Sequence, residues 1–240
     1  CKNAKRIGIS GHIRPDGDCV GAVLALQQYL QKCMPDAEIK VYLEQPPEIF
    51  RELKGYEEIC SEFPEQPPFD VYFALDCGAE RLGEAEKYFR SAEKKINIDH
   101  HVSNTGTGDI NLVEPQIGST CEVLYDLFDG EKLDREIAKA LYIGIIHDTG
   151  VFQYSNTTPE TLKKGAELIS YGFDFPRMIQ ETFYQKTYVQ TQIMGRALME
   201  SIRFLDGRCI VSVVDKKTMD FYEVTPKDMD GIVNQLRNIE

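Results

Sequence analysis

The first hundred residues alternate between apolar segments of strand length and segments of helical or turn character. Between the first two strand-like segments, residues 18–33 carry apolar side chains at helical spacing, and a charged helix is expected over 79–93. Strands alternating with helices are typical of βαβ units. The sequence therefore predicts an α/β fold with a mostly parallel sheet flanked by helices. The expected strands are residues 5–12, 38–44, 71–78 and 94–101.

After residue 115 the pattern becomes helical. One helix is expected after the N-cap Asp134, and another from Thr158-Pro159 to a stop at Gly172. Residues 203–215 predict a hairpin with an Asp206-Gly207 turn, and a final helix is expected from Thr225. A hairpin and one helix cannot bury a core alone, so we expect the start of a second, truncated α/β domain. The predicted parts are a main domain over 1–185, a connector helix over 186–200 and the second domain over 201–240.

Charge and cysteine content narrow the function classes. The net charge of −12 argues against a broad footprint on long duplex nucleic acid, although a small phosphorylated substrate reached through metal ions stays compatible with it. Seven scattered Cys without a C-x-x-C pair argue against a disulfide framework and a zinc–thiolate site. No apolar run has the length of a membrane span, and we expect a cytoplasmic protein with reduced thiols.

Nearly all histidines of the chain stand beside Asp at the expected strand ends. Ligands of open α/β sheets bind outside the carboxyl ends of the strands. Taken singly, Asp18 reads equally well as an N-cap, Asp76 as a turn residue and Asp148 as a helix stop. Their agreement favours one shared site. The candidates are His12, Asp16, Asp18, Asp76, Asp99, His100, His101 and Asp148.

Imidazole and carboxylate without thiolate favour Mn²⁺, with Mg²⁺, Co²⁺ or Zn²⁺ as competitors. Six or more ligands exceed what one ion with an open position uses, and they suit two ions about 3.5–4 Å apart. A carboxylate shared by both ions would hold a bridging water acidic enough to attack phosphorus as hydroxide. The sequence thus predicts a two-metal centre.

Four motifs, HIRPDGD, LDCG, DHHVSN and DTGVFQYSNTTPET, resemble those of the DHH phosphoesterase family in its DHH–DHHA1 branch. The resemblance covers most of residues 5–185. It implies that Asp99 orients the histidine pair, that His101 meets the substrate phosphate or leaving oxygen, and that Asp76 bridges two Mn²⁺ ions. Arg14 is read equally well as a phosphate contact or as a solvated cation. The implied ligands are His12, Asp16 and Asp76 for one ion, and Asp18, Asp76, His100 and Asp148 for the other.

The resemblance implies hydrolysis of short oligoribonucleotides or linear dinucleotides, and also of 3′-phosphoadenosine-5′-phosphate. A cyclic-dinucleotide phosphodiesterase, a family II pyrophosphatase, a RecJ-type exonuclease and a non-catalytic nucleotide-binding module are the alternatives. No membrane partner is expected, and a homodimer is left open. In this branch the second domain carries a Gly-Gly-Gly-His-type motif, which residues 216–240 lack. We therefore expect poor discrimination among substrates from this sequence alone.

Overall fold

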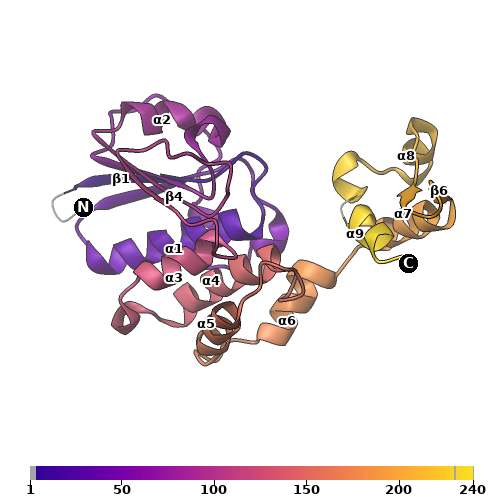
Figure 1. Ribbon diagram of the computed structural model, residues 1–240. Coiled ribbons are helices and arrows are strands. Elements are labelled where there is room, and N and C mark those ends of the chain that lie inside the picture. The colour runs from indigo at the N-terminus through magenta and orange to yellow at the C-terminus, as the bar shows by residue number, and fades with distance from the viewer. Residues whose placement is uncertain (1–3, 230, 240) are drawn as a thin grey trace. The chain divides into compact units, whose positions relative to one another are not determined.

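The computed structural model describes residues 4–229 and 231–239. These residues form two compact units, divided between Phe183 and Tyr184. Each unit has its own core, and the larger one contains the five-stranded sheet (Figure 1). All the candidate site residues belong to the larger unit. None of the described helices has the length and apolar character needed to cross a bilayer.

The larger unit contains a five-stranded sheet in which every neighbouring pair of strands is parallel. Its strands are β1 (Arg6–Ser10), β2 (Glu38–Tyr42), β3 (Val71–Leu75), β4 (Lys94–Asp99) and β5 (Ile110–Val113). The predicted parallel α/β fold is confirmed, and β5 is an additional edge strand. The spatial order is β2-β1-β3-β4-β5, so the direction of winding reverses between β1 and β3. Ligand sites of such sheets lie at this reversal, outside the carboxyl ends of the strands.

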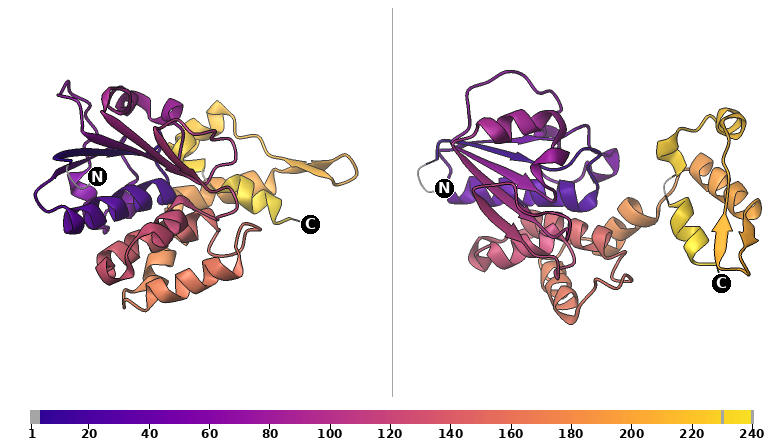
Figure 2. Two further views of the ribbon diagram at one scale, coloured as in Figure 1. Left: turned by 60° about the vertical axis from the view of Figure 1, so that its left-hand side comes forward. Right: turned by 45° about the horizontal axis from the view of Figure 1, so that its top comes forward.

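Helices cover both faces of the sheet (Figures 1 and 2). One face packs against α1 (Gly17–Cys33), with α3 (Thr120–Leu127) and α4 (Arg135–Asp148) beside it. On the other face lies α2 (Glu86–Ser91), which is shorter than the helix expected over 79–93. That expectation was wrong because two 3₁₀ turns precede α2, with Gly83 at a φ of 59°.

Close contact between α1 and α4 positions the acidic residues at their ends. A Cβ added at Gly21 would lie 2.5 Å from the carbonyl oxygen of Ala140 in α4. A Cβ at Gly144 would lie 2.2 Å from Cys121 Sγ and 2.4 Å from Asp18 Oδ1. Such distances are shorter than side chains tolerate in a close-packed interior, so glycine is required for this approach.

The expected start of α1 needs correction, whereas the expected starts of α4 and of the helix after it are confirmed. The N-cap of α1 is Asp16, whose side chain accepts the Cys19 N–H, whereas Asp18 lies within the first turn. Asp134 caps α4 and Thr158 caps α5 (Pro159–Ile169), as predicted.

The segment 176–200 is not one continuous helix. Helix α6 (Phe175–Ile179) is followed by a π-helical turn (Gln180–Tyr184), where the first helical stretch ends. A separate helix, α7 (Tyr188–Met199), then starts at its own N-cap, Thr187.

The smaller unit consists of α7, a hairpin and two further helices. The hairpin strands are β6 (Ile202–Phe204) and β7 (Cys209–Val211), antiparallel as predicted, and α8 (Lys216–Tyr222) follows. The final helix expected from Thr225 is interrupted: a 3₁₀ turn (Pro226–Met229) precedes α9 (Ile232–Arg237). Val213, beyond β7, is 74% exposed, so this unit buries little of its apolar surface.

Candidate metal centre

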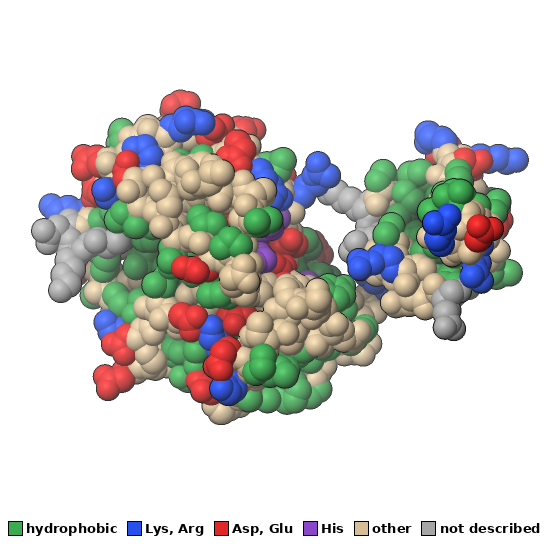
Figure 3. Space-filling model, viewed as in Figure 1, with side chains coloured by type: hydrophobic (Ala, Val, Ile, Leu, Met, Phe, Trp, Pro, Cys, Tyr) green, Lys and Arg blue, Asp and Glu red, His purple; other side chains and the backbone are tan. Residues whose placement is uncertain are grey.

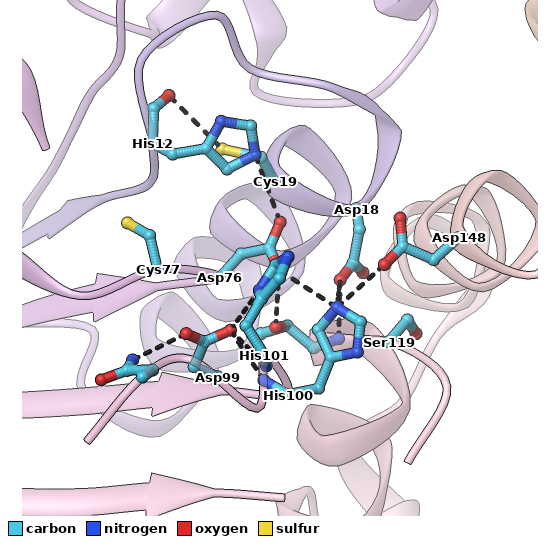
Figure 4. A network of polar contacts seen from close by, with 12 residues as sticks. His12, Asp18, Cys19, Asp76, Cys77, Asp99, His100, His101, Ser119 and Asp148 are labelled. Carbon is cyan, nitrogen blue, oxygen red and sulfur yellow. Dashed lines mark hydrogen bonds and ion pairs between the residues drawn. The ribbon is translucent and has the colours of Figure 1, made fainter. Parts of the chain in front are cut away.

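Three neighbouring strands deliver polar side chains to one edge of the sheet (Figure 4). His12 follows β1, Asp76 follows β3, and Asp99 ends β4 directly before His100 and His101. Two helix ends complete the cluster with Asp18 from α1 and Asp148 from α4. Asp16, the cap of α1, lies beside His12. Eight of the nine predicted site residues therefore lie together.

At one end of the cluster, His12 faces two carboxylates. Its Nε2 lies 3.4 Å from Asp76 Oδ2 and 3.6 Å from Asp16 Oδ1. The other ring nitrogen, Nδ1, is 2.8 Å from the carbonyl oxygen of Ile13. Metal-binding histidines typically donate their second ring N–H to such a carbonyl, which leaves the first nitrogen for the ion.

At the other end, His100 has the same arrangement. Its Nε2 lies 2.9 Å from Asp148 Oδ2, and its Nδ1 is 3.3 Å from the carbonyl oxygen of Ile117. The same Nε2 is 3.6 Å from Asp76 Oδ1 and 3.9 Å from Asp18 Oδ2. Although buried, it makes no hydrogen bond of adequate geometry with the protein. A buried nitrogen that faces three carboxylates without a hydrogen bond fits the position of a metal ligand.

Asp76 lies between the two histidines and is almost completely buried. Its φ of 61° places a non-glycine residue in the left-handed region, which is uncommon and concentrates at functional sites. The Asp76 N–H donates to the carbonyl oxygen of Ile98 in β4, which holds this turn against the neighbouring strand. The backbone thus directs one carboxylate oxygen toward His12 and the other toward His100.

Sequence reasoning missed the contribution of α3. The N–H groups of Thr120 and Cys121 donate to the carboxylate of Asp18 at 2.6 and 2.9 Å, and Thr120 Oγ1 donates to Asp76 Oδ1 at 2.9 Å. The positive end of a helix dipole stabilises a carboxylate at this position. The pattern Ser119-x-x-Glu122 is a helix-start signal that would have located this helix, though not its partner Asp18.

Asp99 holds His101 through a buried polar network. Its Oδ1 is 2.7 Å from His101 Nδ1 and accepts the N–H groups of both histidines. Asn104 Nδ2 donates to Asp99 Oδ2 at 2.6 Å and to Asn97 Oδ1 at 2.9 Å. This geometry leaves Nε2 of His101 available to another group, and the orienting role of Asp99 stays a prediction.

The cluster holds more negative charge than its protein partners neutralise. Asp18, Asp76 and Asp99 are buried, yet within the described ranges their side chains form ion pairs with histidine and none with Lys or Arg. Buried carboxylates are costly unless they are paired or bind metal. In Figure 3, histidine side chains reach the surface of this unit beside acidic ones. The donor set therefore fits divalent cations.

The pKa shifts of the histidines and of Asp18 are further evidence that the cluster favours positive charge. Burial lowers the pKa of His12, but the Asp16 and Asp76 carboxylates outweigh it and raise the value to about 10. For His100, burial is likewise outweighed by Asp148 and Asp18, and its pKa also rises to about 10. Burial raises the pKa of Asp18 well above its usual range. Without a metal, protons supply the charge that a cation would otherwise supply.

Arg14 is the predicted residue that the structure does not bring into the cluster. Its side chain is exposed, and its backbone N–H donates to Glu44 Oε2 at 3.0 Å. Its φ of 54° shows that the loop after His12 turns sharply at this position. A phosphate contact by Arg14 stays a prediction.

We expect Mn²⁺ to raise the melting temperature of the protein, because the ion binds the folded carboxylate cluster and not the unfolded chain. At 100 times the dissociation constant, the gain is about 2.7 kcal/mol, or roughly 5–10 °C for a domain of this size. Thermal melts with Mn²⁺ and with excess chelator measure it. Equal melting temperatures in both conditions would contradict a metal centre at this cluster.

Comparison with known proteins finds relatives over most of the chain. Residues 6–145 match the model of the DHH family, N-terminal domain. The bifunctional oligoribonuclease and PAP phosphatase NrnA of Thermus thermophilus is 31% identical over 239 residues, which cover 98% of this chain and 69% of the relative. The NrnA of Bacillus subtilis is 27% identical over 237 residues, covering 95% and 72%.

A solved structure shows the same fold. The exopolyphosphatase-related protein from Bacteroides fragilis superimposes with a TM-score of 0.91 at 25% identity, covering 99% of this chain and 74% of that one. The matched family segment contains β1 to β5 and most of α4, and so includes every site residue except Asp148.

Proposed function

Since the chain belongs to the DHH family and is a metal-dependent phosphoesterase, we propose that it hydrolyses short oligoribonucleotides and linear dinucleotides to mononucleotides, and that it also acts on 3′-phosphoadenosine-5′-phosphate. Two relatives named for both activities match nearly the whole chain and support this substrate class. The observation that carries the proposal is the convergence of histidines and carboxylates from three strand ends on Asp76.

In this proposal the cluster holds two Mn²⁺ ions, with Mg²⁺ or Co²⁺ as substitutes. His12, Asp16 and Asp76 bind one ion. The second is bound by Asp18, Asp76, His100 and Asp148, with Asp76 shared. When bound, such ions make water acidic enough to act as a nucleophile at neutral pH and offset the charge that develops on the phosphoryl oxygens. His12 Nε2 lies 3.4 Å from Asp76 Oδ2 and 3.6 Å from Asp16 Oδ1. Two atoms that bind the same ion are separated by about this distance, which supports the first group of ligands.

His101 acts on the substrate in this proposal. The hydrogen bond with Asp99 raises the pKa of His101, which favours the protonated ring. With Nδ1 held by Asp99, Nε2 donates a proton or hydrogen bond to the phosphate or to the leaving oxygen. The side chain is about one-third exposed, so a substrate reaches it from solvent.

The smaller unit has a separate proposed role. We assign residues 1–185 to the DHH catalytic domain, 186–200 to a connector and 201–240 to a DHHA1-like substrate-binding domain. The division between Phe183 and Tyr184 supports the first boundary, and it places the proposed connector in the smaller unit together with residues 201–240. The predicted cytoplasmic location and homodimer stay predictions.

An activity panel with Mn²⁺ tests the proposed function. The substrates are a linear dinucleotide, 3′-phosphoadenosine-5′-phosphate, cyclic di-AMP and pyrophosphate, each with a chelator control. We expect turnover of the first two, because relatives named for these activities match 95–98% of the chain. Preference for cyclic di-AMP or pyrophosphate would replace the proposed substrate class, and no turnover of any substrate would favour a non-catalytic nucleotide-binding module.

A further inference from the structure

A buried thiol lies beside the His12 end of the metal centre. Cys19 is completely buried in the first turn of α1, one residue after Asp18. Its sulfur, a ring nitrogen of His12 and a carboxylate oxygen of Asp76 all lie within 4.8 Å of one another. Figure 4 shows the Cys19 sulfur beside the His12 ring. A thiol, an imidazole and a carboxylate therefore lie close to one point.

The surrounding backbone holds this thiol in place. The Cys19 N–H donates to the Asp16 carboxylate at 3.1 Å, so the cap of α1 fixes the residue. A Cβ added at Gly11 would lie 2.2 Å from Cys19 Sγ, so a glycine at the end of β1 makes room for the sulfur. The thiol's polar contact is a long one, 4.0 Å to the carbonyl oxygen of His12. Its sulfur is thus positioned without being committed to a strong partner.

The separations suit the ligand distances of Zn²⁺. His12 Nε2 and Asp76 Oδ2 are 3.4 Å apart, which is about the spacing of two ligands that each bind one ion at roughly 2.1 Å. A sulfur at about 2.3 Å from the same ion would stand roughly 3.5 Å from each of them. Since Cys19 Sγ lies within 4.8 Å of both atoms, binding in this geometry would require a shift of the sulfur of at most about 1 Å.

We propose that Cys19, His12 and Asp76 form a binding site for a thiophilic divalent cation, such as Cd²⁺ or Zn²⁺, at the first metal position. The inference rests on the proposed metal centre and adds a ligand and an ion class to it. On binding, the Cys19 thiol gives its proton to solvent and its sulfur takes a position on the ion. Soft thiolate ligands select such ions, whereas Mn²⁺ and Mg²⁺ prefer the oxygens of Asp16 and Asp76. Thiophilic cations therefore compete with Mn²⁺ at this position.

Cadmium titration tests the thiolate directly. The titration uses a variant with Ser in place of Cys1, Cys33, Cys60 and Cys209, which leaves the buried thiols of Cys19, Cys77 and Cys121. Cd²⁺ is added to the metal-free protein, and the thiolate-to-cadmium charge-transfer absorbance is followed. We expect a band that saturates with one equivalent. Cys19→Ser should abolish it and weaken Cd²⁺ binding by at least the 10–100-fold typical for loss of an outer-shell partner.

Cys77→Ser is the matched control. Cys77 is also buried and stands next to Asp76, but its thiol donates to the carbonyl oxygen of Leu75 and belongs to none of the donor groups found among the described residues. The band should survive in this variant. A band that persists in Cys19→Ser, or that disappears in Cys77→Ser instead, would overturn the inference.

A measurement on a protein that keeps Cys19 covers the case in which Cys19→Ser does not fold. In the protein that lacks the four other thiols but keeps Cys19, the ¹¹³Cd resonance should have the shift of an ion with one thiolate ligand, and a shift typical of nitrogen and oxygen ligands alone would overturn the inference. The outcome is separate from that of the substrate panel. Cadmium bound through Cys19 in a protein that hydrolyses none of the four substrates would contradict the proposed function and support this site.

Discussion

Replacing Asp76 with Asn is expected to lower kcat/KM for a linear dinucleotide by at least the 10²–10³-fold that loss of one preorganised electrostatic group typically costs. The expected loss is larger than for any other single ligand, because the two oxygens of Asp76 face both histidine ends of the cluster. An amide is neutral and offers one acceptor oxygen, so both proposed metal positions lose a ligand charge. Steady-state kinetics with Mn²⁺, together with the metal content of the dialysed protein, measures the effect.

Asn is the appropriate replacement because of the backbone. Asp76 has a φ of 61°, a conformation that Asn tolerates better than other side chains of L residues. The expected result is therefore loss of metal and turnover with little loss of folding. Asp109→Asn, at an exposed aspartate away from the cluster, is the matched control and should retain full activity. Turnover within a few-fold of wild type in Asp76→Asn would refute the shared-ligand role.

Replacing His101 with Ala is expected to reduce kcat by on the order of 10²–10⁴, the usual contribution of a proton-transfer group, with metal binding retained. The difference from His100 follows from geometry. His101 Nδ1 is held by Asp99, whereas the buried Nε2 of His100 faces Asp148 and the other carboxylates. Turnover and Mn²⁺ stoichiometry are measured on the same preparations.

His100→Ala is the counterpart of this experiment. It should lose one of the two Mn²⁺ ions, since it removes a nitrogen ligand, while His101→Ala keeps both. Asp99→Asn should fall between wild type and His101→Ala in kcat, because the ring stays but its hydrogen-bond partner changes. Equal metal loss in the two histidine variants would show that both bind metal. That result would fit the close approach of His101 Nδ1 to Asp76 Oδ1, 3.6 Å.

Local pattern was sufficient for the central strands and for most of the site. VYFAL is apolar throughout because β3 is buried on both faces, and such a run is recognisable without a partner. The edge strand β5 was missed since INLV is short, mixes a polar residue with apolar ones, and leaves Ile110 half exposed. An edge strand with so little buried surface has only weak hydrophobic periodicity. β5 is recognised as a strand by its pairing with β4, which the sequence does not show.

The sequence alone was enough to predict a parallel α/β fold whose strand ends carry His and Asp. Strand length, burial and turn positions follow from short stretches of sequence, so they can be predicted without knowledge of the tertiary structure. The tertiary structure determines which carboxylate caps α1 and which one is held by α3. The local pattern alone predicts Asp18 as the cap of α1. The N–H groups of Thr120 and Cys121, more than a hundred residues away in the chain, take up the Asp18 carboxylate and leave Asp16 as the cap. Contacts of that separation depend on the packing of α1, α3 and α4, and no local signal encodes them.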